Sequence, residues 1–136
     1  MSLKSFFKEN NIKIENVKYI ASDRFKDENG EVIEWELKVL DNKKVDELRN
    51  RFSSRSYVNH KEEFKFNSED FMKVFVTEAI VFPNLTDKDL QDSYGVFSPY
   101  ELLQEILTVG ELTRLTEYIN NLHDYKAEKK VDEIKN

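Results

Sequence analysis

The segment FMKVFVTEAIVF, residues Phe71 to Phe82, decides how the rest of the chain must be arranged. Nine of its twelve residues are apolar, and on a helical wheel they leave only a thin polar strip near Lys73 and Thr77. A helix this apolar is either the centre of its own fold or partly covered by another protein. In a chain of 136 residues the central position is the better interpretation, and it is compatible with the other.

The chain before this segment supplies one further helix. Asp41 or Asn42 can cap a helix that breaks down in the serine-rich FSSRS, residues 52–56. Asn67 or Ser68 then opens the apolar helix, which we expect to continue until Pro83. Between the two helices, residues 53–67 are charged and poorly patterned, so we expect an irregular connection there.

Punctuated helices follow Pro83. Thr86 with Asp89 favours one helix start, and Gly95 suits the left-handed residue just beyond its end. Ser98 begins a stronger signal, with proline next and glutamate three positions on, and Gly110 is expected to interrupt the chain again. Both glycines are either hinges that let the helices adjust around a client or ordinary helix ends. The last helix carries one apolar stripe, formed by Leu112, Leu115, Ile119 and Leu122.

A change of period marks the N-terminal part. In EVIEWELKVL, residues 31–40, apolar and polar side chains alternate, and Trp35 lies on the apolar face. The Asn29-Gly30 pair tolerates positive φ, so we expect a hairpin of residues 17–25 with 31–40. A hairpin alone is marginal and must pack its Trp35 face on the helices. The predicted fold is therefore α+β and mostly helical, with one N-terminal antiparallel hairpin on about five helices.

Length and composition indicate one domain, which we place at residues 1–123, followed by a charged tail at 124–136 that we expect to be flexible. The chain contains no cysteine, so disulfides and thiolate ligands are excluded. The N-terminal residues lack a long apolar run, which argues against a signal sequence or membrane anchor. The net charge of −6 disfavours a mainly electrostatic grip on nucleic acid.

Residues that could carry chemistry are few, and each has a simpler interpretation. Isolated histidines are more often solvated than catalytic, acids before a helix complement its dipole, and paired glutamates on an outer strand face discourage aggregation. We therefore expect no catalytic residue, no metal ligand and no cofactor site. The residues considered were His60, His123, Asp87, Asp89, Asp92, Glu34 and Glu36.

A basic cluster between Lys43 and Arg55 is the feature that favours nucleic acid, but acids are interleaved with it. Asp46 and Glu47 lie at helical spacing from Lys43, so a solvated face of ion pairs is the better interpretation. The cluster consists of Lys43, Lys44, Arg49, Arg51 and Arg55.

Two blocks of sequence resemble a known family. The first is YIASDRFKDENGEVIEWELKVL, residues 19–40, in which an Arg-Phe pair precedes a glycine turn and a strand with Trp35. The second, residues 81–119, contains LQDSYG and a leucine-rich helix leading to Gly110-Glu111. In this order they resemble the XkdN-like tail assembly chaperones of contractile-tailed phages and defective prophages.

The resemblance implies a non-catalytic helper of tail assembly that associates with the tape measure protein and helps tube subunits polymerise around it. It implies the host cytoplasm as the place of action and absence from the finished virion. A regulatory adaptor protein stays open as an alternative, as does a homo-oligomer. The candidate partner contacts are the exposed members of the apolar helix and of the helix after Ser98, taken from Phe71, Phe75, Phe82, Leu102, Leu103 and Ile106.

Overall fold

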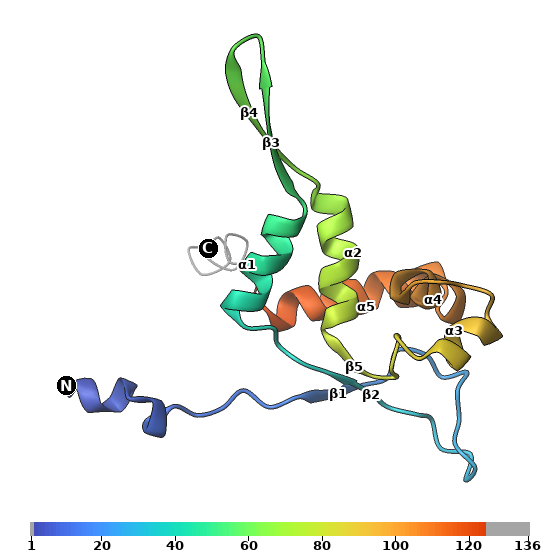
Figure 1. Cartoon of the computed structure of the whole chain (residues 1–136). Coiled ribbons are helices and arrows are strands. Elements are labelled where there is room, and N and C mark those ends of the chain that lie inside the picture. Colours follow the sequence, from blue (N-terminus) through green and yellow to red (C-terminus); the bar gives the residue numbers. More distant parts are fainter. Residues whose placement is uncertain (1, 125–136) are drawn as a thin grey trace, which may run out of the picture.

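The computed structural model describes residues 2–124, and this part of the chain contains five α-helices and two antiparallel sheets (Figure 1). The predicted α+β class is confirmed. Two short 3₁₀ helices, Leu3–Phe6 and Lys8–Asn10, precede the first strand. The helices are α1 (Asn42–Arg51), α2 (Ser68–Glu78), α3 (Lys88–Ser93), α4 (Pro99–Ile106) and α5 (Val109–Leu122). The strands are β1 (Val17–Tyr19), β2 (Trp35–Leu37), β3 (Ser53–Val58), β4 (Lys61–Phe66) and β5 (Ile80–Phe82).

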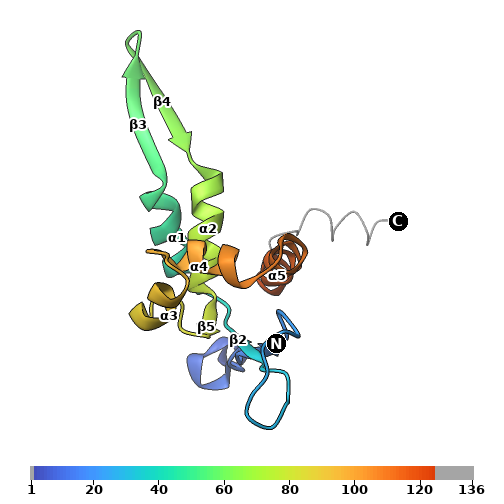
Figure 2. The ribbon, with the colours of Figure 1, turned by 90° about the vertical axis from the view of Figure 1, so that its right-hand side faces the viewer.

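Helix α2 is the centre of the core, as its composition predicted. It packs against α1 on one side and α4 on another, and it leads directly into β5 (Figure 2). Phe75 and Val76 of α2 are almost completely buried. The core also includes Leu48 of α1 and Leu115 of α5, so helices from both halves of the chain close around α2. This arrangement removes the apolar surface of α2 from water.

The N-terminal hairpin forms, but it belongs to a larger sheet. Strand β2 lies between β1 and β5, and both neighbours are antiparallel to it. The turn at Asp27 to Gly30 is closed by a hydrogen bond of 3.0 Å, and Gly30 has a φ of 78°. Trp35 is only 3% exposed, which confirms its predicted place in the core.

The C-terminal end of the apolar segment differs from the prediction. The helix ends at Glu78, and residues 80–82 form β5 instead of a last helical turn. The N–H of Lys38 donates to the carbonyl of Ala79 at 2.8 Å, which joins the segment to β2. Isoleucine and valine at 80 and 81 favour a strand, and pairing with β2 therefore prevails over helix continuation.

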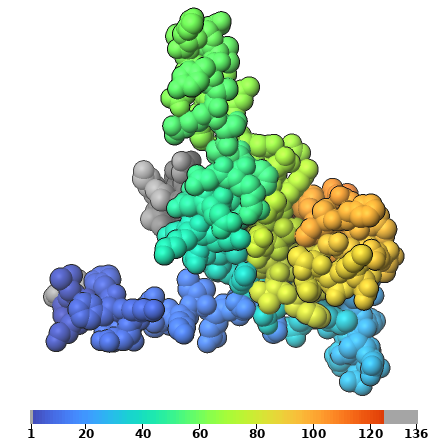
Figure 3. All heavy atoms as spheres, viewed as in Figure 1, coloured from blue at the N-terminus to red at the C-terminus, as the bar shows by residue number. Residues whose placement is uncertain are grey.

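Residues 53–67, expected to be irregular, contain the longest strands in the described part of the chain. Strands β3 and β4 pair over six positions, from Ser53 with Phe66 to Val58 with Lys61. Asn59 and His60 make a two-residue turn with φ of 52° and 64°. The hairpin projects away from the ends of α1 and α2 (Figures 1 and 3). The prediction was wrong because none of these residues is buried in the core, so no core-facing pattern marked them.

Helix boundaries follow the local capping signals closely. Ser98 Oγ accepts from the Glu101 N–H at 3.3 Å, as predicted, whereas Thr86 does not cap α3: Asp87 does, accepting from the Leu90 N–H at 2.9 Å. Gly95 has a φ of 68° beyond α3, as expected. Gly110 does not interrupt the chain, because it lies in the first turn of α5, which Thr108 caps.

The N-terminal end of the chain lies outside the central body. Residues 2–16 extend away from the sheet as an arm (Figure 1), and the large apolar side chains of this arm are exposed. We call this segment the N-terminal arm; its apolar members are Leu3, Phe6, Phe7, Ile12 and Ile14. The expected flexible tail at 124–136 lies outside the described residues except for Asp124.

Candidate partner-binding surface

Five of the six predicted partner contacts lie in the core, and one is accessible. Phe82 of β5 is 51% exposed. The other five line the packing between α2, α4 and their neighbours, because the apolar faces of both helices point inward. Of these six residues, only Phe82 is accessible to another protein in this conformation. The buried five are Phe71, Phe75, Leu102, Leu103 and Ile106.

An apolar cleft of about 140 Å³ opens beside Phe82. Trp35 of β2 and Ile106 of α4 are among its buried lining residues, and Leu90 of α3 and Tyr94, which directly follows α3, also line it. We call it the Phe82 cleft. Its full lining is Phe25, Ile33, Trp35, Phe82, Pro83, Leu90, Tyr94 and Ile106.

Local geometry explains why Phe82 stays accessible. It is the last residue of β5 and pairs with Glu36 of β2, and Pro83 follows it through a cis peptide bond. The β2–β5 register shifts between Glu36 and Leu37, so the strand is irregular where the apolar side chains change direction. Ile80 is buried in the core, while Phe82 faces the cleft.

A partly exposed ion pair between Arg24 and Glu111 supports one wall of the Phe82 cleft. The Arg24 guanidinium donates to the carbonyl of Ile106 and to Glu111 Oε1, both at 2.7 Å, and it lies 5.4 Å from the centre of the Phe25 ring. Glu111 also accepts from the Thr108 N–H at 2.9 Å. That backbone hydrogen bond, followed by the one from Arg24, lowers the pKa of Glu111 to about 2. The first hairpin is thereby tied to α4 and α5.

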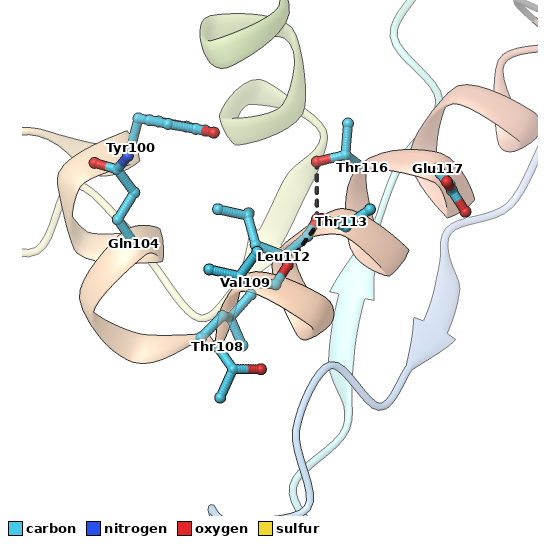
Figure 4. A pocket seen from close by; sticks show the side chains of 9 residues that line it. Tyr100, Gln104, Thr108, Val109, Leu112, Thr113, Thr116 and Glu117 are labelled. Carbon is cyan, nitrogen blue, oxygen red and sulfur yellow. Dashed lines mark hydrogen bonds between the residues drawn. The ribbon is translucent and has the colours of Figure 1, made fainter.

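A second hollow, of about 370 Å³, runs between α4 and α5 (Figure 4). Tyr100, Leu107 and Leu112 give it an apolar side, and threonines line the other. The hydroxyls of Thr113 and Thr116 donate to the carbonyls of Val109 and Leu112 in their own helix. Both hydroxyls are therefore already hydrogen-bonded within α5.

The β3–β4 hairpin presents a third apolar surface, which the sequence reasoning missed. Tyr57, Phe64 and Phe66 lie on one face, because alternate residues of paired strands point the same way. Phe64 is 63% exposed, and only Phe66 touches the body, with its ring 5.4 Å from that of Phe71. The alternation of aromatic residues at 64 and 66 was the signal that could have revealed it.

The structure shows the surroundings of the residues that were considered for catalysis or metal binding. Exposed His60 is at the hairpin tip, as expected, but His123 is half-buried and hydrogen-bonded, contrary to the prediction that it is solvated. Its Nε2 accepts from the Leu40 N–H at 2.7 Å, and its ring lies 4.6 Å from that of Phe75. Glu36 binds Lys18 at 2.8 Å, and this hydrogen bond lowers the pKa of Glu36. Within residues 2–124, no three histidine or acidic side chains are grouped as metal ligands.

Three members of the basic cluster, Lys44, Arg51 and Arg55, pair with neighbouring acids. Glu47 lies 3.0 Å from Arg51 and 3.8 Å from Lys44, and Lys44 also lies 3.7 Å from Glu78. Arg55 pairs with Glu62 across the hairpin at 3.3 Å. The interpretation as an ion-paired face agrees with this geometry. A continuous phosphate-binding stripe does not.

Comparison with known proteins places this small α+β protein in a class. The family of phage XkdN-like tail assembly chaperone proteins matches residues 3–135. The chain therefore belongs to the XkdN-like family of phage tail assembly chaperones.

Two relatives come from Bacillus subtilis (strain 168). The phage-like element PBSX protein XkdN is 30% identical over 100 residues, which span 73% of this chain and 68% of XkdN. The uncharacterized protein YqbN is 29% identical over 100 residues, 73% of this chain and 67% of YqbN. A crystal structure of YqbN matches with a TM-score of 0.76 at 23% identity, covering 91% of this chain and 97% of that one, which supports the fold. No helix in residues 2–124 is long and apolar enough to cross a membrane.

Proposed function

We propose that this chaperone binds the tape measure protein during tail assembly, and tube subunits with it, and that it performs no chemistry. The observation that carries the proposal is Phe82, half exposed above an apolar cleft in a member of a tail chaperone family. A long amphipathic helix needs its apolar stripe covered until the tube encloses it. The Phe82 cleft offers a place for one large apolar side chain of such a helix.

The packing around the cleft supports this assignment. Trp35 forms a buried floor, and the Arg24–Glu111 pair holds the adjoining wall to α5. A preformed apolar pocket binds a side chain with little loss of its own conformational entropy. The site of action that follows from this proposal is the host cytoplasm, before the tail is complete.

Co-expression with the cognate tape measure protein tests the proposal. We expect that protein to be more soluble with the chaperone and to co-purify with it. Moderate salt should weaken retention little, because apolar contact is not screened as phosphate contacts are. If the tape measure protein and the tube protein both behave identically with and without the chaperone, the proposal fails, and a regulatory adaptor becomes the better interpretation.

A matched pair of variants tests the surface. Phe82→Asp places a charge at the mouth of the cleft and should reduce retention of the tape measure protein at least tenfold, since a buried unpaired carboxylate is costly. Phe97→Asp is the control: Phe97 is 89% exposed and does not line the cleft, so retention should be unchanged. Equal retention by both variants would move the contact away from Phe82.

A further inference from the structure

The outer edge of β4 has an orientation that can be derived from its base. The N–H of Asn67 donates to the carbonyl of Phe52 at 2.9 Å, so this pair is hydrogen-bonded. Hydrogen-bonded and non-hydrogen-bonded pairs alternate along an antiparallel ladder. With the observed register, the backbone groups of Glu62, Phe64 and Phe66 therefore point outward, away from β3.

We propose that two copies of the chain associate by antiparallel pairing of their β4 strands, with Phe64 on the two-fold axis. A two-stranded hairpin that projects by itself is marginally stable, and an outward-facing row of backbone groups is a template for another strand. A second copy supplies an identical row. The pairing would make one four-stranded sheet from two hairpins.

The geometry of the edge admits only some registers. In a symmetric antiparallel pair each residue and its opposite must lie on the same face and have the same outward or inward backbone orientation. With Phe64 facing Phe64 of the second copy, Glu62 faces Phe66, and all of these have outward backbone groups. Between these pairs, Glu63 faces Lys65. This is a non-hydrogen-bonded pair, in which the side chains of opposite residues come closest.

Charge selects this register from its neighbours. It places Glu63 opposite Lys65 twice, once on each side of the axis, so both contacts are attractive. A register shifted so that Glu63 faces Glu63 of the second copy also places Lys61 opposite Lys65. Like charges then face each other at each of these non-hydrogen-bonded pairs. A shift the other way sets Lys65 against itself. Charged edges usually prevent association, but the alternating signs on β4 favour the register centred on Phe64 over the two registers adjacent to it.

The proposed register also covers the most exposed part of the hairpin. Phe64, 63% exposed, would contact its own counterpart across the axis on the aromatic face. Tyr57 and Phe66 of each copy would lie on that same face of the joined sheet. The interface does not use the Phe82 cleft, so the proposal is independent of which tail protein the chaperone binds.

Charge reversal combined with sedimentation equilibrium tests the proposal on the full chain. The wild type should show twice the 16.2 kDa mass of one chain, at concentrations up to about 100 μM, where small interfaces associate. Glu63→Lys and Lys65→Glu should each weaken association at least tenfold, and the double variant, which exchanges the charges, should restore it. Lys43→Glu, at an exposed position of α1, makes the same charge change as Lys65→Glu away from the hairpin and should leave association unchanged.

Cysteine cross-linking reports the register directly. The chain has no native cysteine, so Phe64→Cys introduces one thiol per copy. A hydrogen-bonded antiparallel pair holds its Cα atoms about 5.5 Å apart, within disulfide reach. Mild oxidation should give a covalent dimer with Phe64→Cys and none with Tyr57→Cys, which lies on the same face but on β3.

Three results would overturn the proposed β4–β4 dimer. A monomeric wild type throughout the concentration range overturns the proposal, as does a dimer that neither single charge reversal weakens. A monomer whose aromatic hairpin face retains a tail protein would assign this surface to a client instead and would also overturn it. Restoration by the double variant cannot arise from misfolding, because both single changes are still present in it.

Discussion

The described part of the chain contains two antiparallel hairpins, one packed in the core and one exposed. In the pair β1–β2, Trp35 and Leu37 point into the core. In the pair β3–β4 every residue except half-buried Ser53 is exposed, although its strands are twice as long. Strand pairing therefore does not decide what is buried. The decisive factor is whether helices lie over the apolar face, and only the first pair has them.

The largest expected effect removes the residue that anchors the first pair. Trp35→Ala should lower the free energy of unfolding by about 3–5 kcal/mol, because a large core side chain is replaced by a cavity. Urea denaturation followed by circular dichroism measures it. A loss below about 1 kcal/mol would contradict the assignment of Trp35 to the core.

The same comparison applies to the two histidines: His123 contacts Leu40, which follows β2, and His60 lies in the turn between β3 and β4. His123→Ala should lower the free energy of unfolding by about 1–3 kcal/mol, because the Leu40 N–H loses its acceptor and Phe75 loses a ring contact. His60→Ala, at the exposed hairpin tip, should change it by less than about 0.5 kcal/mol. Equal effects of the two variants in thermal melts would contradict the structural role of His123.

Acid should release the tie between the first hairpin and α5. The pKa of Glu111 is about 2 in the folded chain against 4.5 for the free side chain, so its stabilisation is complete above pH 4.5 and is lost as pH falls from 4.5 toward 2. Glu111→Gln should therefore cost about 1–2 kcal/mol at pH 7 and progressively less below pH 4.5. Urea titrations at several pH values give the difference, and a cost independent of pH would refute the ionic contribution.

The smallest effect is expected on the second pair. Tyr57 is 79% exposed, so Tyr57→Ser should change the free energy of unfolding by less than about 0.5 kcal/mol. Differential scanning calorimetry beside Trp35→Ala sharpens the contrast. A loss comparable with that of Trp35→Ala would mean that the hairpin is packed against something in solution.

Local signals and core burial were the predictable part of the fold. Trp35 alternates with polar neighbours, which predicted a strand with a buried face. Ser98 precedes a proline and a glutamate, which predicted a helix start. Ile80 did not, because its strand exists only through pairing with Leu37, far away in sequence. The β3–β4 hairpin was missed for another reason: its apolar face meets no core.

The candidate site divides in the same way. Phe82 could be named from the apolar run that contains it, but its cleft could not, because Phe25 and Tyr94 line it from segments far apart in the sequence. The other five predicted contacts share the apolar character of Phe82 and differ only in facing inward. The sequence identifies an apolar side chain, but tertiary packing decides whether it is buried in its own chain or left exposed for a partner to cover.

The hydrogen bond between Asn67 and Phe52 has a consequence for how this family can vary. It closes the base of the hairpin, so the chain leaves α1 and returns to α2 at nearly the same place. Adding or deleting two residues from each strand would leave that base unchanged and keep every remaining side chain on its face. Hairpin length is thus separable from core stability. Changes in the length or the surface residues of the hairpin are therefore compatible with the same core.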